Sequence, residues 1–184
     1  KDVYAYCYLH CNPGKRVLVF VNSIKTARRL DGLLRALNLN CRVIHAQLQQ
    51  RQRIRALESF QKSSNGILVA TDVAARGLDI ADIDTVVHYD VARSPQVYIH
   101  RSGRTARANR AGISISMVSP EDHIYHSAIV NVVGKAVVTP SGEGGKLTKT
   151  DKMKAKLGGL EDFSVDTAAL GVLRQRCTLA KKIF

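Results

Sequence analysis

The sequence of 184 residues predicts an α/β fold in which a parallel sheet is covered by helices on both faces. Short segments that are apolar on both faces alternate along the chain with stretches in which apolar residues recur every three or four positions. Strands that alternate with helices are joined by right-handed crossovers and therefore run parallel. In such sheets, ligands bind beyond the carboxyl ends of the strands.

The predicted elements begin near the N-terminus. Residues 3–9 alternate between small apolar residues and tyrosines, which predicts a strand, and residues 12–14 (Asn-Pro-Gly) predict a turn. Residues 17–21 are apolar throughout and predict a central strand, after which Asn22 and Ser23 cap a helix. Further strands are predicted at 42–44, 66–70, 85–89 and 112–118, and further helices at 53–60, 96–101 and 121–133.

The character of the chain changes at about residue 134. Residues 139–146 are loop-like, and residues 146–156 are rich in lysine and poor in apolar side chains, as in segments that order only on a partner. Apolar residues in 164–184 fall at spacings of three and four and predict an amphipathic helix. We therefore expect an α/β domain at 1–133 and a basic C-terminal extension at 134–184.

The composition points to a polyanionic partner. The formal net charge is +13, from 28 Lys and Arg against 15 Asp and Glu, which favours nucleic acid ahead of a membrane or an acidic protein. No apolar run is long enough to cross a bilayer, and the sequence begins without a secretory leader. The four cysteines lack paired spacing, so we expect free thiols in a reducing, intracellular compartment. Because the sequence does not begin with Met, we expect a piece of a longer protein.

Two blocks place polar and charged groups where predicted strands end. The first is Ala-Thr-Asp-Val-Ala-Ala-Arg-Gly-Leu-Asp-Ile at 70–80, and the second is His-Arg-Ser-Gly-Arg-Thr-Ala-Arg at 100–107. A guanidinium keeps its charge and offers a rigid fork of donors, which suits phosphate oxygens. Arg104 and Arg107 lie three residues apart and can face one anion from the same side of a turn. The lack of GxGxxG after any strand excludes a dinucleotide-binding enzyme.

These two blocks, with Val-Phe-Val-Asn-Ser at 19–23 and a block at 45–53 ahead of them, resemble the C-terminal RecA-like lobe of DEAD-box RNA helicases. The resemblance covers about residues 1–133 and matches in order and spacing. It implies an ATP-dependent RNA helicase in the intact protein, with RNA held mainly through its sugar-phosphate backbone and no membrane partner. The chain has neither GxxxxGK[ST] nor Asp-Glu-Ala-Asp. ATP and Mg²⁺ would therefore be held mainly by an N-terminal RecA-like lobe, and this fragment alone would be inactive.

The resemblance assigns nucleotide contacts to residues of the two long blocks. Arg104 and Arg107 would act as arginine fingers on the γ-phosphate of ATP. Asp79 would hydrogen-bond the ribose, and Gly77 would allow a close approach of the backbone. The two residues that would couple the nucleotide site to the companion lobe are His100 and Arg101.

The RNA contacts implied by the resemblance come from three blocks. Thr71 would contact an RNA phosphate, and Gln50 and Arg53 would begin a helix beside the RNA backbone. Asn22 and Ser23 would hold a phosphate at the start of a helix. The sequence departs from the usual family pattern at Ala46, Ser102 and Ala106, where Gly, Ile and Gly are common.

The blocks and the basic extension also resemble the nucleolar DEAD-box helicases that assist assembly of the large ribosomal subunit. This subgroup implies the nucleus and nucleolus as location and pre-ribosomal particles as partners. One alternative is a non-enzymatic RNA-binding assembly module on the same fold, although such a module has no need of finger arginines. A DEAH-type or DNA-translocating helicase is another alternative, against which the form of the 70–80 block argues. The histidines lack metal-ligand spacing, so we expect no metal site in this chain.

Overall fold

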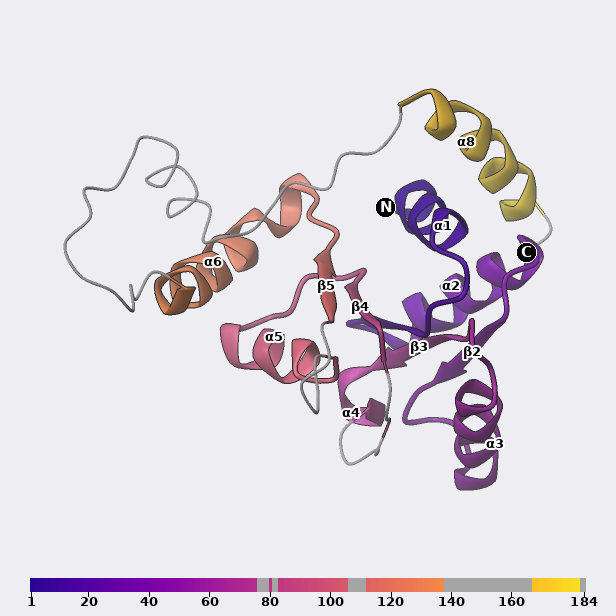
Figure 1. Ribbon diagram of the computed structural model, residues 1–184, viewed down its shortest axis with the longest axis horizontal. Coiled ribbons are helices and arrows are strands. Elements are labelled where there is room, and N and C mark those ends of the chain that lie inside the picture. Colours follow the sequence, from indigo (N-terminus) through magenta and orange to yellow (C-terminus); the bar gives the residue numbers. More distant parts are fainter. Residues whose placement is uncertain (76–79, 81–82, 106–111, 138–166, 183–184) are drawn as a thin grey trace.

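The computed structural model describes residues 1–75, 80, 83–105, 112–137 and 167–182. Within these ranges, five strands form one sheet in the order β2-β3-β1-β4-β5, and all neighbouring strands are parallel (Figure 1). The parallel α/β fold that the sequence predicts is thereby confirmed. The strands are β1 (Val17–Val21), β2 (Cys41–Ile44), β3 (Ile67–Thr71), β4 (Thr85–His88) and β5 (Ile113–Ser116).

The register of the sheet brings the carboxyl ends of the strands to one edge. Val21 pairs with Thr71, and Phe20 pairs with Ala70 on one side and His88 on the other. Every residue of β1 and β3 is buried, because helices cover both faces of the sheet. The polar residues that follow these strands therefore meet at a single edge.

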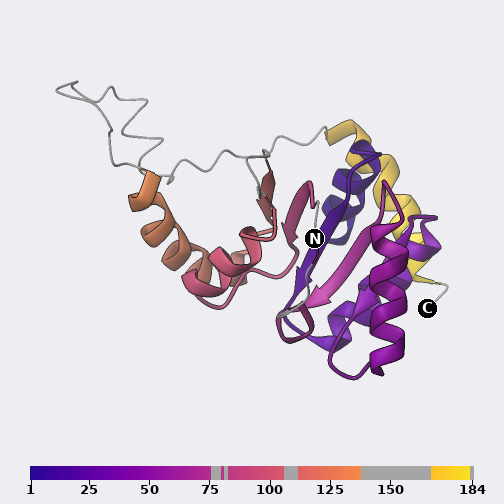
Figure 2. The same ribbon diagram turned by 60° about the horizontal axis from the view of Figure 1, so that its bottom comes forward.

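Helices cover the two faces of the sheet (Figures 1 and 2). On one face, α1 (Asp2–Cys11) and α2 (Ile24–Ala36) pack against alternate strand residues, because apolar side chains recur on α2 every three or four positions. On the other face lie α3 (Gln50–Gln61) and the single turn α4 (Asp72–Ala75). Beside β4 and β5, α5 (Pro95–Ser102) packs against α6 (His123–Val137), which follows the short η1 (Pro120–Asp122).

Side-chain caps define where three of these helices begin. The Oγ of Ser23 accepts a hydrogen bond from the Thr26 N–H (3.0 Å) at the start of α2. Ser94 Oγ accepts from the Val97 N–H (3.3 Å), and Pro95 occupies the first position of α5. At α3, Gln49 and Gln52 form a capping box. Helices α2 and α3 thus begin within a few residues of a strand end, at the edge where ligands bind.

The predicted strand at 3–9 is wrong, because these residues form α1. Residues 5–9 are all buried. Ala5 and Tyr8 belong to the core against the sheet, whereas Tyr6 and Cys7 pack against α2 and the C-terminal helix. A helix covered on two sides has no polar stripe, so the period of 3.6 that marks a surface helix is missing from its sequence.

The helix expected within 164–184 is confirmed as α8 (Thr167–Lys181). Its apolar side chains Leu170, Leu173, Cys177 and Ala180 are buried against α1 and α2. The four cysteines are free thiols. Among the helices of the described residues, none is long and apolar enough to cross a membrane.

Candidate functional site

The carboxyl edge of the sheet is organised around the side chain of Arg101, which is 1% exposed. Its Nε and Nη2 donate to the two carboxylate oxygens of Asp72, each at 2.7 Å. Nη2 also donates to Asn22 Oδ1 (2.7 Å), and Nη1 donates to the Asp90 carbonyl oxygen (2.7 Å). One guanidinium therefore joins the segments that follow β1, β3 and β4.

Arg101 is one of the two residues expected to couple the nucleotide site to the companion lobe. Its guanidinium lines the pocket described below, hydrogen-bonds to Asp72, Asn22 and Asp90, and lies over the Phe20 ring at 5.1 Å from the centroid. A buried guanidinium needs a charged partner, which Asp72 supplies. Arg101 is thus a positioning residue for the edge.

Asn22 is also engaged internally. Besides accepting from Arg101, its Nδ2 donates to the Val91 carbonyl oxygen (3.0 Å), and its backbone N–H donates to Asp90 Oδ2 (2.8 Å). Ser23 is exposed next to it and caps α2 through its hydroxyl. The two residues lie at the predicted edge, and both are exposed.

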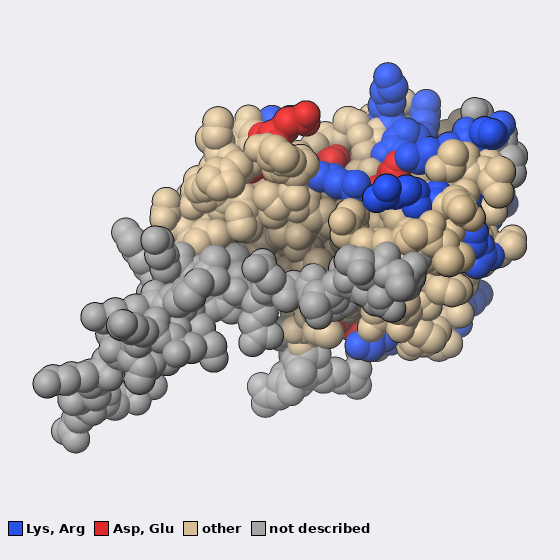
Figure 3. All heavy atoms as spheres, turned by 90° about the horizontal axis from the view of Figure 1, so that it is seen from above, with Lys and Arg blue, Asp and Glu red and all other residues tan. Residues whose placement is uncertain are grey.

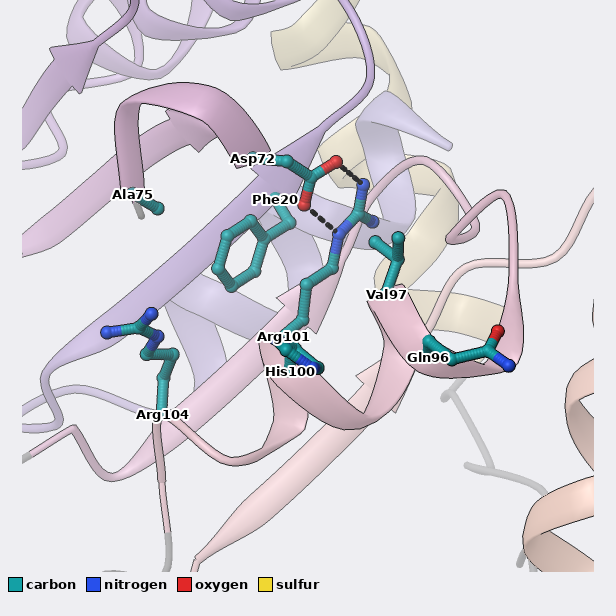
Figure 4. A pocket seen from close by; sticks show the side chains of 8 residues that line it. All are labelled: Phe20, Asp72, Ala75, Gln96, Val97, His100, Arg101 and Arg104. Atoms are coloured by element: carbon teal, nitrogen blue, oxygen red, sulfur yellow. Dashed lines mark hydrogen bonds and ion pairs between the residues drawn. The ribbon is translucent and has the colours of Figure 1, made fainter. Parts of the chain in front are cut away.

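A pocket of about 110 Å³ lies between α4 and α5 (Figure 4). Figure 4 shows Arg104 reaching toward α4 on one side of the Phe20 ring, with Arg101 and Asp72 on the other. His100 lines the same pocket and is exposed. The residues that line it are Phe20, Asp72, Ala75, Gln96, Val97, His100, Arg101 and Arg104.

Three of the residues expected to contact RNA lie around α4. Thr71 ends β3 and pairs with Val21 in the register, beside Asn22. Arg53 at the start of α3 donates through Nη2 to the Ala74 carbonyl oxygen of α4 (3.3 Å), and through Nη1 to Gln50 Oε1 (3.4 Å). The structure therefore brings Gln50, Arg53 and Thr71 together around α4.

Three of the predicted site residues, Gly77, Asp79 and Arg107, lie outside the described residues. Sequence reasoning missed Asp72 and Asp90, whose roles depend on contacts across the sheet. A carboxylate directly after a buried strand, in a chain with an arginine-rich block, is the pattern that could have indicated Asp72. Among the described residues, no group of His, Cys, Asp and Glu could hold a metal ion.

Ser102, one of the departures from the family pattern, lies behind the pocket. The Nε2 of the fully buried His88 is 3.1 Å from Ser114 Oγ and 3.3 Å from Ser102 Oγ, and the two serine hydroxyls are 3.0 Å apart. The His88 ring also stacks on Tyr98 of α5 at 4.6 Å. Burial, and then the charge of Arg101, lower the pKa of His88 to about 3, so the ring is neutral. This cluster fixes α5 to β4 and β5.

A parallel α/β lobe with an arginine-lined pocket and a basic edge at the carboxyl ends of its strands is typical of RecA-like proteins that bind nucleotides and nucleic acids. Residues 1–109 match the family model of the helicase conserved C-terminal domain. The E. coli DEAD-box protein SrmB is similar in structure, with a TM-score of 0.66 and 35% identity over 72% of this chain and 78% of that chain. The chain therefore belongs to the helicase C-terminal domain family and, within it, to the DEAD-box proteins.

Several curated relatives match the whole chain, among them proteins of Neurospora crassa and Homo sapiens. It is 42% identical to the ATP-dependent RNA helicase mak-5 of Neurospora crassa and 40% identical to the ATP-dependent RNA helicase DDX24 of Homo sapiens. The chain spans only 23% and 19% of these proteins, respectively. Domain 2 of the Mss116p DEAD-box helicase, solved with an RNA duplex, shares the fold at 21% identity, with a TM-score of 0.63 over 98% of this chain and 72% of that chain.

Proposed function

We propose that this chain is the C-terminal lobe of an ATP-dependent DEAD-box RNA helicase. The observation that carries the proposal is the position of α4 between two groups of site residues. Ala75 of α4 lines the pocket that holds His100 and Arg104, while the Ala74 carbonyl accepts a hydrogen bond from Arg53. A single turn of helix thus touches both the nucleotide side and the RNA side of the edge, as coupling between the two ligands requires.

The chemistry of the pocket fits the phosphate groups of ATP. The Asp72 carboxylate is paired with Arg101, and Arg104 adds a second guanidinium to the lining of the pocket. ATP supplies the phosphoryl group that is transferred, and an arginine on its γ-phosphate stabilises the charge that spreads over those oxygens. Arg104 and Arg107 take this role, Asp79 and Gly77 take the ribose and a close backbone approach, and His100 faces the companion lobe. The N-terminal lobe holds most of the contacts to ATP and Mg²⁺.

On the RNA side, the proposed contacts are to the backbone. Thr71, Arg53 and Gln50 lie around α4, and Ser23 with Asn22 begins α2 at the same edge. Hydroxyls, amides and guanidinium groups at helix starts suit phosphate oxygens and read no base edges. RNA is therefore bound with little sequence preference.

In the intact protein, closure of the two lobes brings this edge onto ATP while both lobes hold one RNA strand and bend it. A duplex does not accept that bend, so a few base pairs open. The matches to the Neurospora crassa and human helicases cover the whole of this chain, including the basic extension, and support membership of the nucleolar subgroup. We place the protein in the nucleus and nucleolus, where it acts on pre-ribosomal particles.

The test is RNA-stimulated ATP hydrolysis by the intact protein carrying Arg104→Ala or Arg107→Ala. Each substitution is expected to lower kcat by about 10³-fold or more while RNA affinity is largely kept. Arg55→Ala, at an exposed position of α3, is the matched control and is expected to keep kcat. An unchanged kcat in both variants would show that Arg104 and Arg107 are not arginine fingers. A wild-type protein that binds RNA without hydrolysing ATP would be a non-enzymatic assembly module.

A further inference from the structure

Lys and Arg gather outside the proposed edge, over one side of the face shown in Figure 3. Helix α8 contains no Asp or Glu, and α2 contains one acid, Asp31. The cations of these two helices and of the residue after α8 are Lys25, Arg28, Arg29, Arg35, Arg174, Arg176, Lys181 and Lys182. This part of the surface is therefore strongly positive.

Arg28 connects the proposed RNA edge to the basic side of α2. Its Nη2 donates to Gln47 Oε1 (3.0 Å), and its Nε donates to His45 Nε2 (3.3 Å). Both partners belong to the loop that leads from β2 into α3, where Gln50 and Arg53 begin the helix. Burial, and then the charge of Arg28, lower the pKa of His45. Neither partner is an anion, and Arg28 forms no ion pair with any residue in the described part of the chain, so its positive charge is available beside the edge.

Asp2 connects α2 to α8. Its carboxylate accepts from Nη1 and Nη2 of Arg29 (2.9 and 3.0 Å) and forms an ion pair with Lys181 Nζ (2.5 Å). Burial alone would raise the pKa of Asp2, but hydrogen bonds from Arg29, Lys181 and Tyr89 outweigh it and leave the pKa well below its usual range. The carboxylate is ionised and holds two cations side by side, which leaves a net positive charge.

A further cation of α8, Arg174, lies in line with Lys181. Arg174 lies seven residues, or about two turns, before Lys181 and therefore on the same side of the helix. Arg174 and Lys182 are exposed, and neither forms an ion pair with any residue that the structure describes. The exposed apolar residues Val172 and Leu179 lie on a different side of α8 from Arg174 and Lys181, whereas Lys182, three residues after Leu179, lies between the two sides.

We propose that these cations continue the RNA path beyond the sheet edge, so that a single RNA strand runs from Arg53 across α2 to α8. The surface, here termed the α2–α8 basic strip, is Lys25, Arg28, Arg29, Arg174, Lys181 and Lys182. The proposal rests on the proposed function, because it assigns the nucleotides that flank those held at the edge. The strip combines many cations with little apolar surface, which fits a phosphate backbone.

The test compares RNA lengths with the intact protein. Single-strand sites on proteins cover on the order of 4–16 nucleotides, so a series of oligouridines from below to above that range separates the edge from the strip. The variant is Arg174→Gln with Lys182→Gln, and the matched control is Arg55→Gln with Lys62→Gln, which removes one exposed cation from the middle of α3 and one from the residue after it. Thermal melting of both variants checks that the fold is kept.

We expect the shortest oligouridine to bind wild type and the strip variant alike. Long oligouridine is expected to bind the strip variant several-fold more weakly, and the slope of log affinity against log salt is expected to fall by about 1.4 in magnitude, for two lost phosphate contacts. The control variant keeps the wild-type affinity at both lengths.

Equal affinity of the strip variant and the control for long oligouridine would overturn the proposal, as would a loss already present with the shortest one. Arg53→Ala separates this failure from failure of the proposed function. If Arg53→Ala weakens binding at every oligouridine length while the strip variant keeps the wild-type affinity, the edge binds RNA and the strip does not. If the wild-type protein binds no RNA, both the proposed function and the proposed role of the strip are wrong.

Discussion

Arg101 on α5 and Asp72 on α4 form a two-point ion pair, with both nitrogen-oxygen distances at 2.7 Å and the guanidinium 1% exposed. The pair joins the two helices that flank the pocket of the proposed nucleotide site. It therefore sets the separation of α4 and α5, on which the direction of Arg104 depends. Arg101 acts through this pair, and Arg104 is the arginine of α5 and its following turn that we assign to the phosphate.

Replacing Asp72 with Ala is expected to destabilise the lobe strongly, because it leaves the Arg101 guanidinium buried without a counter-charge. Breaking a buried pair in this way costs about 3–5 kcal/mol of the free energy of unfolding, measurable by urea denaturation. Arg35→Ala is the control, since the Arg35 side chain is 51% exposed and its pair with Asp31 four residues earlier is of the i,i+4 helix type, worth about 0.3–0.5 kcal/mol. Similar small losses in both variants would show that the Arg101 pair contributes little to folding.

Stability is expected to depend on pH through His88. Its pKa is about 3 in the folded chain and 6.5 in the unfolded chain, so between these values the unfolded chain binds the extra proton. The free energy of unfolding should be fully present above pH 6.5 and fall as the pH drops toward 3. Urea denaturation at about pH 7 and about pH 4.5 measures the loss, and His88→Asn should reduce it. His123→Asn, on the exposed start of α6, is the control, and the same pH dependence in both variants would exclude His88 as its source.

Arg53 and Arg51 give a matched pair for RNA binding. Arg53 is half-buried at the edge and faces α4, whereas Arg51 is exposed two residues earlier. Arg53→Ala is expected to weaken binding to unrelated single-stranded sequences alike and to lower the salt slope by about 0.7 for one phosphate. Arg51→Ala should change both quantities less. Filter binding at several salt concentrations measures them, and a loss confined to one sequence would contradict recognition of the backbone.

The isolated 184-residue chain is expected to show negligible RNA-stimulated ATP hydrolysis, because its sequence holds neither GxxxxGK[ST] nor Asp-Glu-Ala-Asp. The measurement is phosphate release by the purified chain with saturating RNA, with the intact protein as the positive control. Measurable turnover by the chain alone would refute the proposal that its site is half of a catalytic pocket.

Much of the fold could be predicted because its strands are buried on both faces and its helices carry apolar stripes. The segments at 17–21 and 66–70 are apolar throughout, and both belong to the centre of the sheet. Alternation with a period of two gave the wrong element at 3–9, where α1 is covered by the sheet on one side and by α8 on the other. The pattern of apolar residues in α1 depends on its contact with α8, which lies more than 150 residues away in the sequence.

The sequence by itself determined the parallel α/β fold, the family and the grouping of polar residues at one edge, because periodicity, helix caps and strand ends are local properties of the chain. Only the tertiary structure decided which groups each charged side chain contacts. Arg101 and Arg104 stand three residues apart in one block and both line the pocket, yet Arg101 is buried and paired with Asp72 across the fold while Arg104 lies on the other side of the Phe20 ring. The partner of a buried charged side chain lies on another element of the fold, so the residues next to it in the sequence do not specify that partner.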